Sequence, residues 1–218
     1  MGRRGVPLII LTLALCSSAS FSKDDHTFAC SARRFDLTSF EGQPSIPSPD
    51  GRKRIQLRKD YKYAVFVHDK QVTVLEYSDT NCCIEIGWSP DSSQFFITYS
   101  NSATYHQYKT HLFSIAGEQV SEDRVTQIAF DDFGSHHSCP SRGGNNLFLL
   151  GWTKDSQNVF LVSEVTPTGD CGKEAGVHGG YLVNGREGTI IHRYGQEHTD
   201  KIENACRVVG ILLADALK

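Results

Sequence analysis

Histidine and cysteine side chains lie close together in one stretch of the sequence. His136, His137 and Cys139 fall within residues 135–144, and His178 or His192 could join them from farther along the chain. Imidazole nitrogen and thiolate sulfur are ligands that zinc prefers in proteins. The pattern matches no spaced zinc signature, however, and an oxidising compartment favours a disulfide for Cys139. We therefore expect no metal and no cofactor, and keep His136, His137 and His178 as candidate ligands for an alternative function.

Other catalytic signatures do not occur in the sequence. There is no Gly-x-Ser-x-Gly elbow, no His-Glu-x-x-His helix and no phosphate-binding Gly-x-x-x-x-Gly-Lys loop. We assign no catalytic residue, and this pattern favours a binding role over an enzymatic one.

The first 22 residues have the order of a secretory signal peptide. Arg3 and Arg4 precede an apolar run over residues 6–15, and small residues follow it. The run is about half the length that a helix needs to cross a bilayer. Leu15 is too large for the position before a lipid-modified cysteine, so we expect no lipid anchor on Cys16. We predict export to the periplasm or the cell exterior, and no transmembrane segment in the mature chain.

The charge balance excludes some partners. The whole chain has a net charge of −3, and loss of Arg3 and Arg4 would make it more acidic. Nucleic acid and anionic membranes bind basic surfaces, so we expect neither of them as a partner. We therefore expect the partner to be an unidentified protein or small ligand.

Six of the seven cysteines would remain after export. An even count in an oxidising compartment favours disulfides. Our first choice is Cys139 with Cys171, because both lie in Gly-, Pro- and Ser-rich loops that we expect at the same end of a sheet. Cys30 with Cys206 is a less secure closing bridge.

An internal repeat is the strongest pattern in the chain. The segment from Ile84 aligns without a gap on the segment from Phe148, and a fainter copy covers residues 47–55. The residues that recur at an offset of 64 are Gly87 and Gly151, Trp88 and Trp152, Asp91 and Asp155, Ser92 and Ser156, and Phe96 and Phe160. Pro49 and Asp50 mark the first copy. Proline presets the first central position of a turn, and the short Asp side chain bonds to nearby backbone. We predict a strand, a tight turn and a returning strand in each copy.

The stretches between these turns read as further strands, because they are rich in β-branched and aromatic residues. We predict a hairpin of residues 63–68 and 72–77 around Asp69-Lys70. A second joins residues 110–115 and 125–130, and a third joins residues 180–183 and 189–194. Four strands per copy, connected up and down, are typical of a propeller blade.

The repeat resembles the blades of TolB-like β-propellers, relatives of the tryptophan-aspartate repeat family with a Trp-Ser-Pro-Asp-Gly signature. The resemblance covers roughly residues 45–194 and is strongest at residues 87–92. Lys154 replaces the signature proline, Pro47 replaces the first tryptophan, and three blades are visible where closed propellers have about four or more. An extra blade in divergent sequence, open sheets and assembly of several chains all stay open.

The end of the chain differs from its body. Asp200 and Glu203 form a helix-start pattern, and apolar residues then recur at helical spacing, so we predict a helix over residues 200–217. We expect its apolar face to cover an open sheet edge.

These elements predict an all-β chain with a short C-terminal helix. Its parts are a signal peptide at 1–22, an extension at 23–44, a propeller-like domain at 45–196 and a helical tail at 197–218. The predicted function is an exported binding or scaffolding protein that contacts its partner through blade-end loops. The alternative is a small secreted metal-dependent hydrolase built on His136 and His137.

Overall fold

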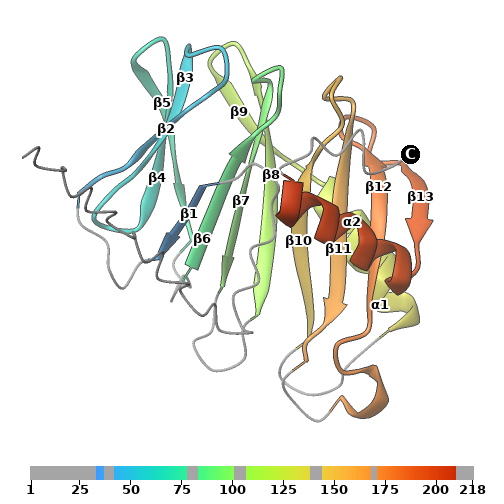
Figure 1. Cartoon of the computed structure of the whole chain (residues 1–218). Helices are drawn as coiled ribbons and strands as arrows, with labels where there is room; N and C mark the ends of the chain where they lie inside the picture. Colours follow the sequence, from blue (N-terminus) through green and yellow to red (C-terminus); the bar gives the residue numbers. More distant parts are fainter. Residues whose placement is uncertain are drawn as a thin grey trace, which may run out of the picture.

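The computed structural model describes residues 33–36, 42–77, 83–100, 107–137, 144–167 and 171–209. The predicted signal peptide lies outside this part of the chain. Three antiparallel sheets stand side by side in a row, with the first and third at opposite ends (Figure 1). The strands of the first sheet are β2 (Ser45–Pro47), β3 (Lys53–Leu57), β4 (Lys62–Val67) and β5 (Lys70–Glu76). Those of the second are β1 (Arg33–Asp36), β6 (Cys83–Trp88), β7 (Gln94–Ser100), β8 (Tyr108–Ala116) and β9 (Gln119–Asp123). Those of the third are β10 (Asn145–Trp152), β11 (Asn158–Val165), β12 (His178–Asn184) and β13 (Ile190–Tyr194).

Two α-helices and a 3-10 helix, Gly172–Glu174, complete the described chain. Helix α1 (Val125–His136) lies between β9 and β10, and α2 (Gln196–Val209) follows β13. No helix among the described residues has the length and apolar character to cross a membrane. The predicted fold class is confirmed: the chain is mainly antiparallel β, in blade-like sheets compatible with a partial propeller, with a short C-terminal helix.

Strand β1 is an addition that the sequence did not predict. It comes from the N-terminal extension and pairs antiparallel with β6, with Phe35 opposite Ile84. The strand is only four residues long and three of them are charged, so it carries no recognisable alternation.

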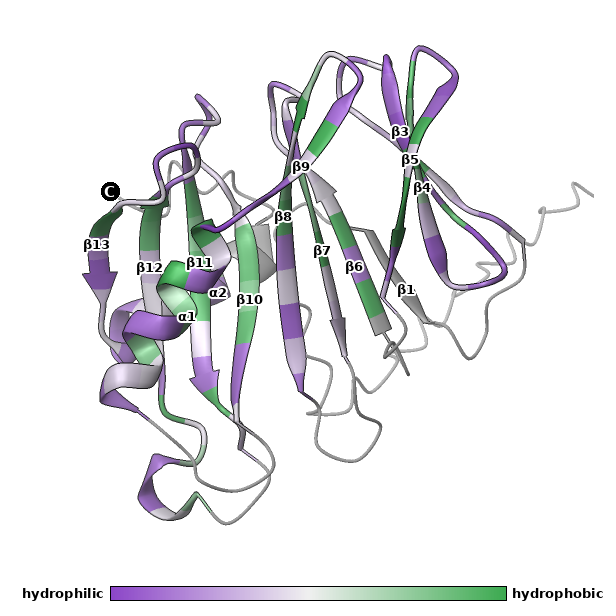
Figure 2. Cartoon of the chain, turned by 180° about the vertical axis from the view of Figure 1, so that it is seen from behind, coloured by the Kyte–Doolittle hydropathy of each residue, from purple (hydrophilic) through white to green (hydrophobic). Residues whose placement is uncertain are grey.

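The core forms where the faces of neighbouring sheets meet. Ile55 and Val65 of the first sheet pack with Ile86 and Phe95 of the second, and all four are fully buried. The opposite face of the second sheet meets the third. Figure 2 shows hydrophobic residues along much of β10, where every residue after Asn145 is buried.

The predicted strand over residues 125–130 is wrong. Gln119–Asp123 forms the fourth strand, and residues 125–130 begin α1. Val125, Ala129 and Phe133 recur at every fourth position and are buried on the face of α1 that packs against the third sheet. This spacing fits a helix, although β-branched Val125 and Thr126 imitate a strand locally.

The first hairpin turns one residue earlier than predicted. Its central residues are His68 and Asp69, with φ of 48° and 63°, and β5 already starts at Lys70. Two successive left-handed residues are characteristic of the tight turns that match strand twist.

The C-terminal helix begins at Gln196, before the predicted start at Asp200. The Asp200 carboxylate does not cap the helix, because its Oδ1 lies 2.8 Å from His178 Nε2 on β12. Ile202, only 1% exposed, packs against Phe148 and Phe160 of the third sheet. Helix α2 therefore covers a face of this sheet and not an edge, while α1 lies on the opposite face (Figures 1 and 2). Residues 210–217 lie outside the described part.

Candidate functional site

The recurring turn residues form the same hydrogen-bond pattern three times. In the second turn Ser89 Oγ donates to Asp91 Oδ1 at 2.7 Å, and Asp91 Oδ1 also accepts the Ser93 backbone N–H at 3.0 Å. Ser92 occupies the left-handed region with φ 62°. Corresponding bonds hold Asp50 with Ser48 and Arg52, and Asp155 with Thr153 and Gln157. The predicted strand, turn and returning strand are confirmed in all three copies.

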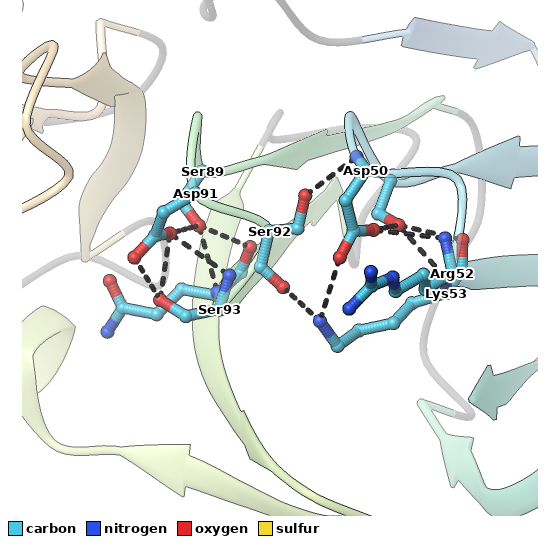
Figure 3. Close-up of polar contacts among 9 residues, drawn as sticks. Asp50, Arg52, Lys53, Ser89, Asp91, Ser92 and Ser93 are labelled. Atoms are coloured by element: carbon cyan, nitrogen blue, oxygen red, sulfur yellow. Dashed lines mark hydrogen bonds and ion pairs between the residues drawn. The ribbon is translucent and has the colours of Figure 1, made fainter. Parts of the chain in front are cut away.

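These turns also connect one sheet to the next (Figure 3). The Asp50 backbone N–H donates to Ser92 Oγ at 3.0 Å, and the Asp91 backbone N–H donates to Ser156 Oγ at 3.1 Å. Lys53 Nζ adds a bond of 3.0 Å to the Ser92 carbonyl oxygen. We call this series of bonds the turn ladder.

The two tryptophans extend the same connections into the core. Trp88 donates its ring N–H to the Ile46 carbonyl oxygen at 3.2 Å, and Trp152 donates to Gln94 Oε1 at 3.1 Å. Each tryptophan thus bonds to the preceding sheet. The recurring aspartates and tryptophans therefore connect neighbouring sheets, while Pro49 belongs to the turn that carries Asp50.

Hydrogen bonding keeps the turn carboxylates ionised. The Ser48 hydroxyl is the main cause that lowers the pKa of Asp50 to about 2. Burial raises the pKa of Asp91, but the bonds from Ser89 and Ser93 outweigh it and the net shift is downward. A carboxylate that accepts several bonds gains most in its charged form.

A cleft of about 840 Å³ lies where the chain leaves the second sheet for the third. Strand β9 pairs with β8 only along Leu112–Ala116, because Asp123 stands opposite Leu112 and the chain then crosses to α1 (Figure 2). The start of β8 is therefore not covered by β9. The lining residues are Tyr108, Lys109, Thr110, His111, Glu122, Asp123, Arg124, Thr126, Gln127, Phe130, Asn145 and Leu147.

The acidic groups of the cleft already have partners. Glu122 Oε1 lies 2.5 Å from His111 Nδ1. Asp123 Oδ2 accepts bonds from Ser114 Oγ at 2.6 Å and from Gln94 Nε2 at 3.2 Å. Both carboxylates are therefore hydrogen-bonded within the protein, and Asp123 keeps its negative charge because its donors are neutral.

The cationic side chains of the cleft form no ion pairs with described residues. Lys109 and Arg124 are exposed, and neither forms an ion pair with any residue of the described ranges. Arg124 directly precedes α1, whose first turn has neither an acidic residue nor a side-chain cap. The helix N-terminus adds partial positive charge there. The two cations of the cleft, Lys109 and Arg124, thus stand beside two carboxylates, Glu122 and Asp123, without an ion pair to either of them.

The imidazole ring of His111 is held by side chains on both sides. Nδ1 faces Glu122, Nε2 lies 3.4 Å from the Tyr99 hydroxyl, and the Tyr77 ring centroid lies 4.5 Å away. Burial raises the pKa of the Tyr77 phenol. Both ring nitrogens of His111 thus contact side chains of the second sheet.

The predicted metal ligands each have a different partner. His136 Nδ1 contacts the Asp132 carbonyl oxygen of its own helix at 2.9 Å. His137 Nδ1 faces Glu174 at 2.8 Å, and His178 Nε2 faces Asp200 at 2.8 Å. Among the described residues no three His, Cys, Asp or Glu side chains are grouped as a metal site.

The cysteine predictions fall largely outside the described residues. Cys171 is buried, with 8% of its surface exposed, and is disulfide-bonded. Cys30, Cys139 and the side chain of Cys206 lie outside the part that the structure describes, so both pairings stay predictions.

Sequence reasoning missed the cleft because its residues were assigned to a regular hairpin. Only the helical spacing of Val125, Ala129 and Phe133 could have shown that the chain leaves the sheet after Asp123. No protein-family model matches the chain, and no curated protein matches it either.

Proposed function

We propose that this chain is an exported binding or scaffolding protein built from divergent TolB-like, tryptophan-aspartate-repeat-like blades. The resemblance is supported by Trp88, Asp91 and their counterparts, which occupy equivalent places in strand-turn-strand units. Export is supported by the order of residues 1–22. Contact with the partner is made at the blade end where β8 and β10 begin.

The observation that carries the binding role is the cleft between the second and third sheets. Its volume of about 840 Å³ falls within the range of ligand pockets, about 300–1,000 Å³. Leu147 and Tyr108 give it buried apolar walls, and Lys109 and Arg124 supply charges that form no ion pair within the described ranges. In a binding pocket, apolar walls contribute affinity and polar groups such as those of the cleft fix the orientation of the ligand.

The same groups argue for binding over catalysis. His111 is engaged at both nitrogens, and Thr110 Oγ1 is shared between the Leu147 carbonyl oxygen at 2.8 Å and Thr98 Oγ1 at 2.7 Å. A nucleophile needs a neighbouring base to activate it. Thr110 and His111 do not form such a pair with each other.

Filling the cleft tests this function. A display library of random twelve-residue peptides is panned against the full chain and against Gln127→Trp, which places an indole on the first turn of α1 inside the cleft. Gln119→Trp, on the exposed start of β9, is the matched control. We expect binders of the wild type and of Gln119→Trp to be lost with Gln127→Trp. Binders that tolerate Gln127→Trp as well as Gln119→Trp would exclude the cleft as the site.

We also propose the Cys139–Cys171 disulfide as a staple of this blade end. The burial of Cys171 fits a structural bond better than a reactive thiol. Mass mapping of non-reduced peptides is expected to recover a peptide containing both cysteines. A peptide that links either cysteine elsewhere would contradict the pairing.

A further inference from the structure

We infer that helix α2 is a pH-sensitive lid over the outer face of the third sheet, which a proton on His178 holds shut and which opens as the pH rises. This face lies opposite to the one that carries α1, whose first turn lines the cleft. The inference therefore goes beyond the proposed binding site. It depends on three observations: the small number of buried side chains on α2, the hydrogen bonds of His178 and the carboxylates that act on its charge.

Helix α2 covers an apolar face with few buried side chains of its own. Between Gln196 and Ala205 only Thr199 and Ile202 are buried. Ile202 packs in a cluster with four buried side chains from the outer face of β10 and β11: Phe148, Leu150, Phe160 and Val162. An element with few buried apolar contacts opens at a lower free-energy cost than the core of its domain. We therefore expect α2 to detach while the sheets stay folded.

His178 joins the third sheet to α2 through its imidazole ring. It is the first residue of β12, and its side chain is only 15% exposed. Nδ1 lies 3.1 Å from the Gly176 carbonyl oxygen, and Nε2 lies 2.8 Å from Asp200 Oδ1 on α2. A carbonyl oxygen and an ionised carboxylate only accept hydrogen bonds, and a neutral imidazole has only one N–H. Both bonds therefore form only when the ring carries its second proton.

Three carboxylates act on the charge of His178 or respond to it. Asp200 and Glu203 lie one helical turn apart on α2, and both favour the protonated ring. Glu164 stands directly opposite His178 on β11, and its Oε2 accepts a bond of 3.0 Å from Asn146 Nδ2. Loss of the proton would leave the carboxylates of α2 and of β11 together without this cation. Like charges repel, and more strongly where water is partly excluded.

The sign of the pH effect follows from these contacts. Burial lowers the pKa of His178, but the bonds to the Gly176 carbonyl and to Asp200, with the charge of Glu203, outweigh it and the net shift is upward from 6.5. Detachment of α2 removes Asp200 and Glu203 from the ring and so removes their part of this shift. The proton therefore stabilises the closed lid fully below pH 6.5, and this stabilisation is lost as the pH rises through the higher pKa of the closed state.

Amide hydrogen exchange of the full chain measures the opening directly. The exchange rate of the Ile202 N–H on α2 is divided by its intrinsic rate at each pH, which gives an opening constant. The Phe160 N–H on β11 reports unfolding of the sheet in the same way. Between about pH 5.5 and about pH 8.5 we expect the opening constant of Ile202 to rise about tenfold or more, because a bond to a charged group is lost. At the higher pH it should exceed that of Phe160 by about tenfold or more.

Two variants of α2 with nearly unchanged side-chain shape locate the effect. In Asp200→Asn the side-chain amide can donate to Nε2 of neutral His178, so the rise in the opening constant should shrink to about threefold or less. Glu197→Gln is the matched control, because the Glu197 side chain is 88% exposed and pairs with Lys201 of the same helix at 2.8 Å. This variant should keep the full rise of the wild type.

Three results would overturn the inference. The first is an opening constant of Ile202 that is the same at both pH values. The second is equal opening of Ile202 and Phe160 at the higher pH, which would show that α2 is released only when the sheet unfolds. The third is a full rise with pH in Asp200→Asn, or loss of the rise in Glu197→Gln, because either would assign the effect to charges other than the pair of His178 and Asp200.

Discussion

The turn ladder makes a prediction at Ser92 in which two physical effects can be separated. Its side chain is fully buried, its Oγ accepts the Asp50 N–H from the preceding sheet at 3.0 Å, and its φ is 62°. Replacement of Ser92 by alanine removes the hydroxyl acceptor and keeps the strain of a left-handed residue with a Cβ. Replacement by glycine removes the hydroxyl acceptor and the strain.

The magnitudes follow from these two terms. Loss of a partner for the part-buried Asp50 N–H is expected to cost about 1–2 kcal/mol in Ser92→Ala. A left-handed residue with a Cβ costs about 1–2 kcal/mol, offset by about 0.5–1 kcal/mol for the extra freedom of glycine in the unfolded chain. Ser92→Gly should therefore fall between the wild type and Ser92→Ala.

Gly51 provides the control for strain alone. It has φ 69°, its added Cβ would meet nothing within 4 Å, and as a glycine it offers no hydroxyl to the ladder. Gly51→Ala should therefore cost about 1 kcal/mol through its backbone. This value should match the difference between Ser92→Ala and Ser92→Gly.

Thermal and urea unfolding can be followed by the fluorescence of Trp88 and Trp152, both buried between sheets. One kcal/mol corresponds to about 2–4 °C in Tm for a chain of this size, so Ser92→Ala should melt about 2–8 °C below the wild type. An unchanged Tm for Ser92→Ala would refute the role of the ladder. A lower Tm for Ser92→Gly than for Ser92→Ala would refute the argument about strain.

Three further predictions concern acid, base and the C-terminal helix. The pKa of Asp50 is lowered from 3.8 to about 2 in the folded chain. Its contribution to stability is therefore present above pH 3.8 and is lost as the pH falls towards 2. In Asp50→Asn, the free energy of unfolding should no longer fall over this pH range. Burial lowers the pKa of His178, but bonds to the Gly176 carbonyl and to Asp200 outweigh it and raise the pKa above 6.5. Its contribution to stability is therefore full below pH 6.5 and is lost at higher pH, and the slope of the unfolding free energy against pH in this range should flatten in His178→Gln. Ile202→Ala should lower the free energy of unfolding by about 2–5 kcal/mol and speed amide exchange in α2, whereas Ile128→Ala, at a residue 37% exposed, should change the free energy by about 0.5 kcal/mol or less.

The sequence predicted those parts of the fold that depend on local chemistry. The turns at Asp50, Asp91 and Asp155 were found because a short hydroxyl or carboxylate side chain must bond the backbone of its own turn, and this leaves a residue pattern. The strands that flank them followed from alternation. Their pairing order followed from short connections.

The candidate site could not be predicted, because it depends on where the chain leaves a sheet. Val125 and Thr126 have strand propensity, and only packing of Ala129 and Phe133 against the third sheet makes this segment a helix. Propensity yields to such tertiary contacts. Once residues 125–130 were assigned to a strand, β8 had no free edge and Lys109 and Arg124 had no cleft to line.

The same tertiary contacts favour the cleft between sheets over either end of the row as the candidate site. At one end Ile202 of α2 packs on the outer face of the third sheet. At the other end the outer face of the first sheet is polar, with Arg54 stacked 4.0 Å over Phe66 and Lys62 bonded to Glu76 at 2.6 Å. Repeat arrays need such polar or covered ends, because an apolar end face would recruit another unit. Because one end face is covered and the other is polar, the cleft between the second and third sheets is the place where we propose that a partner binds.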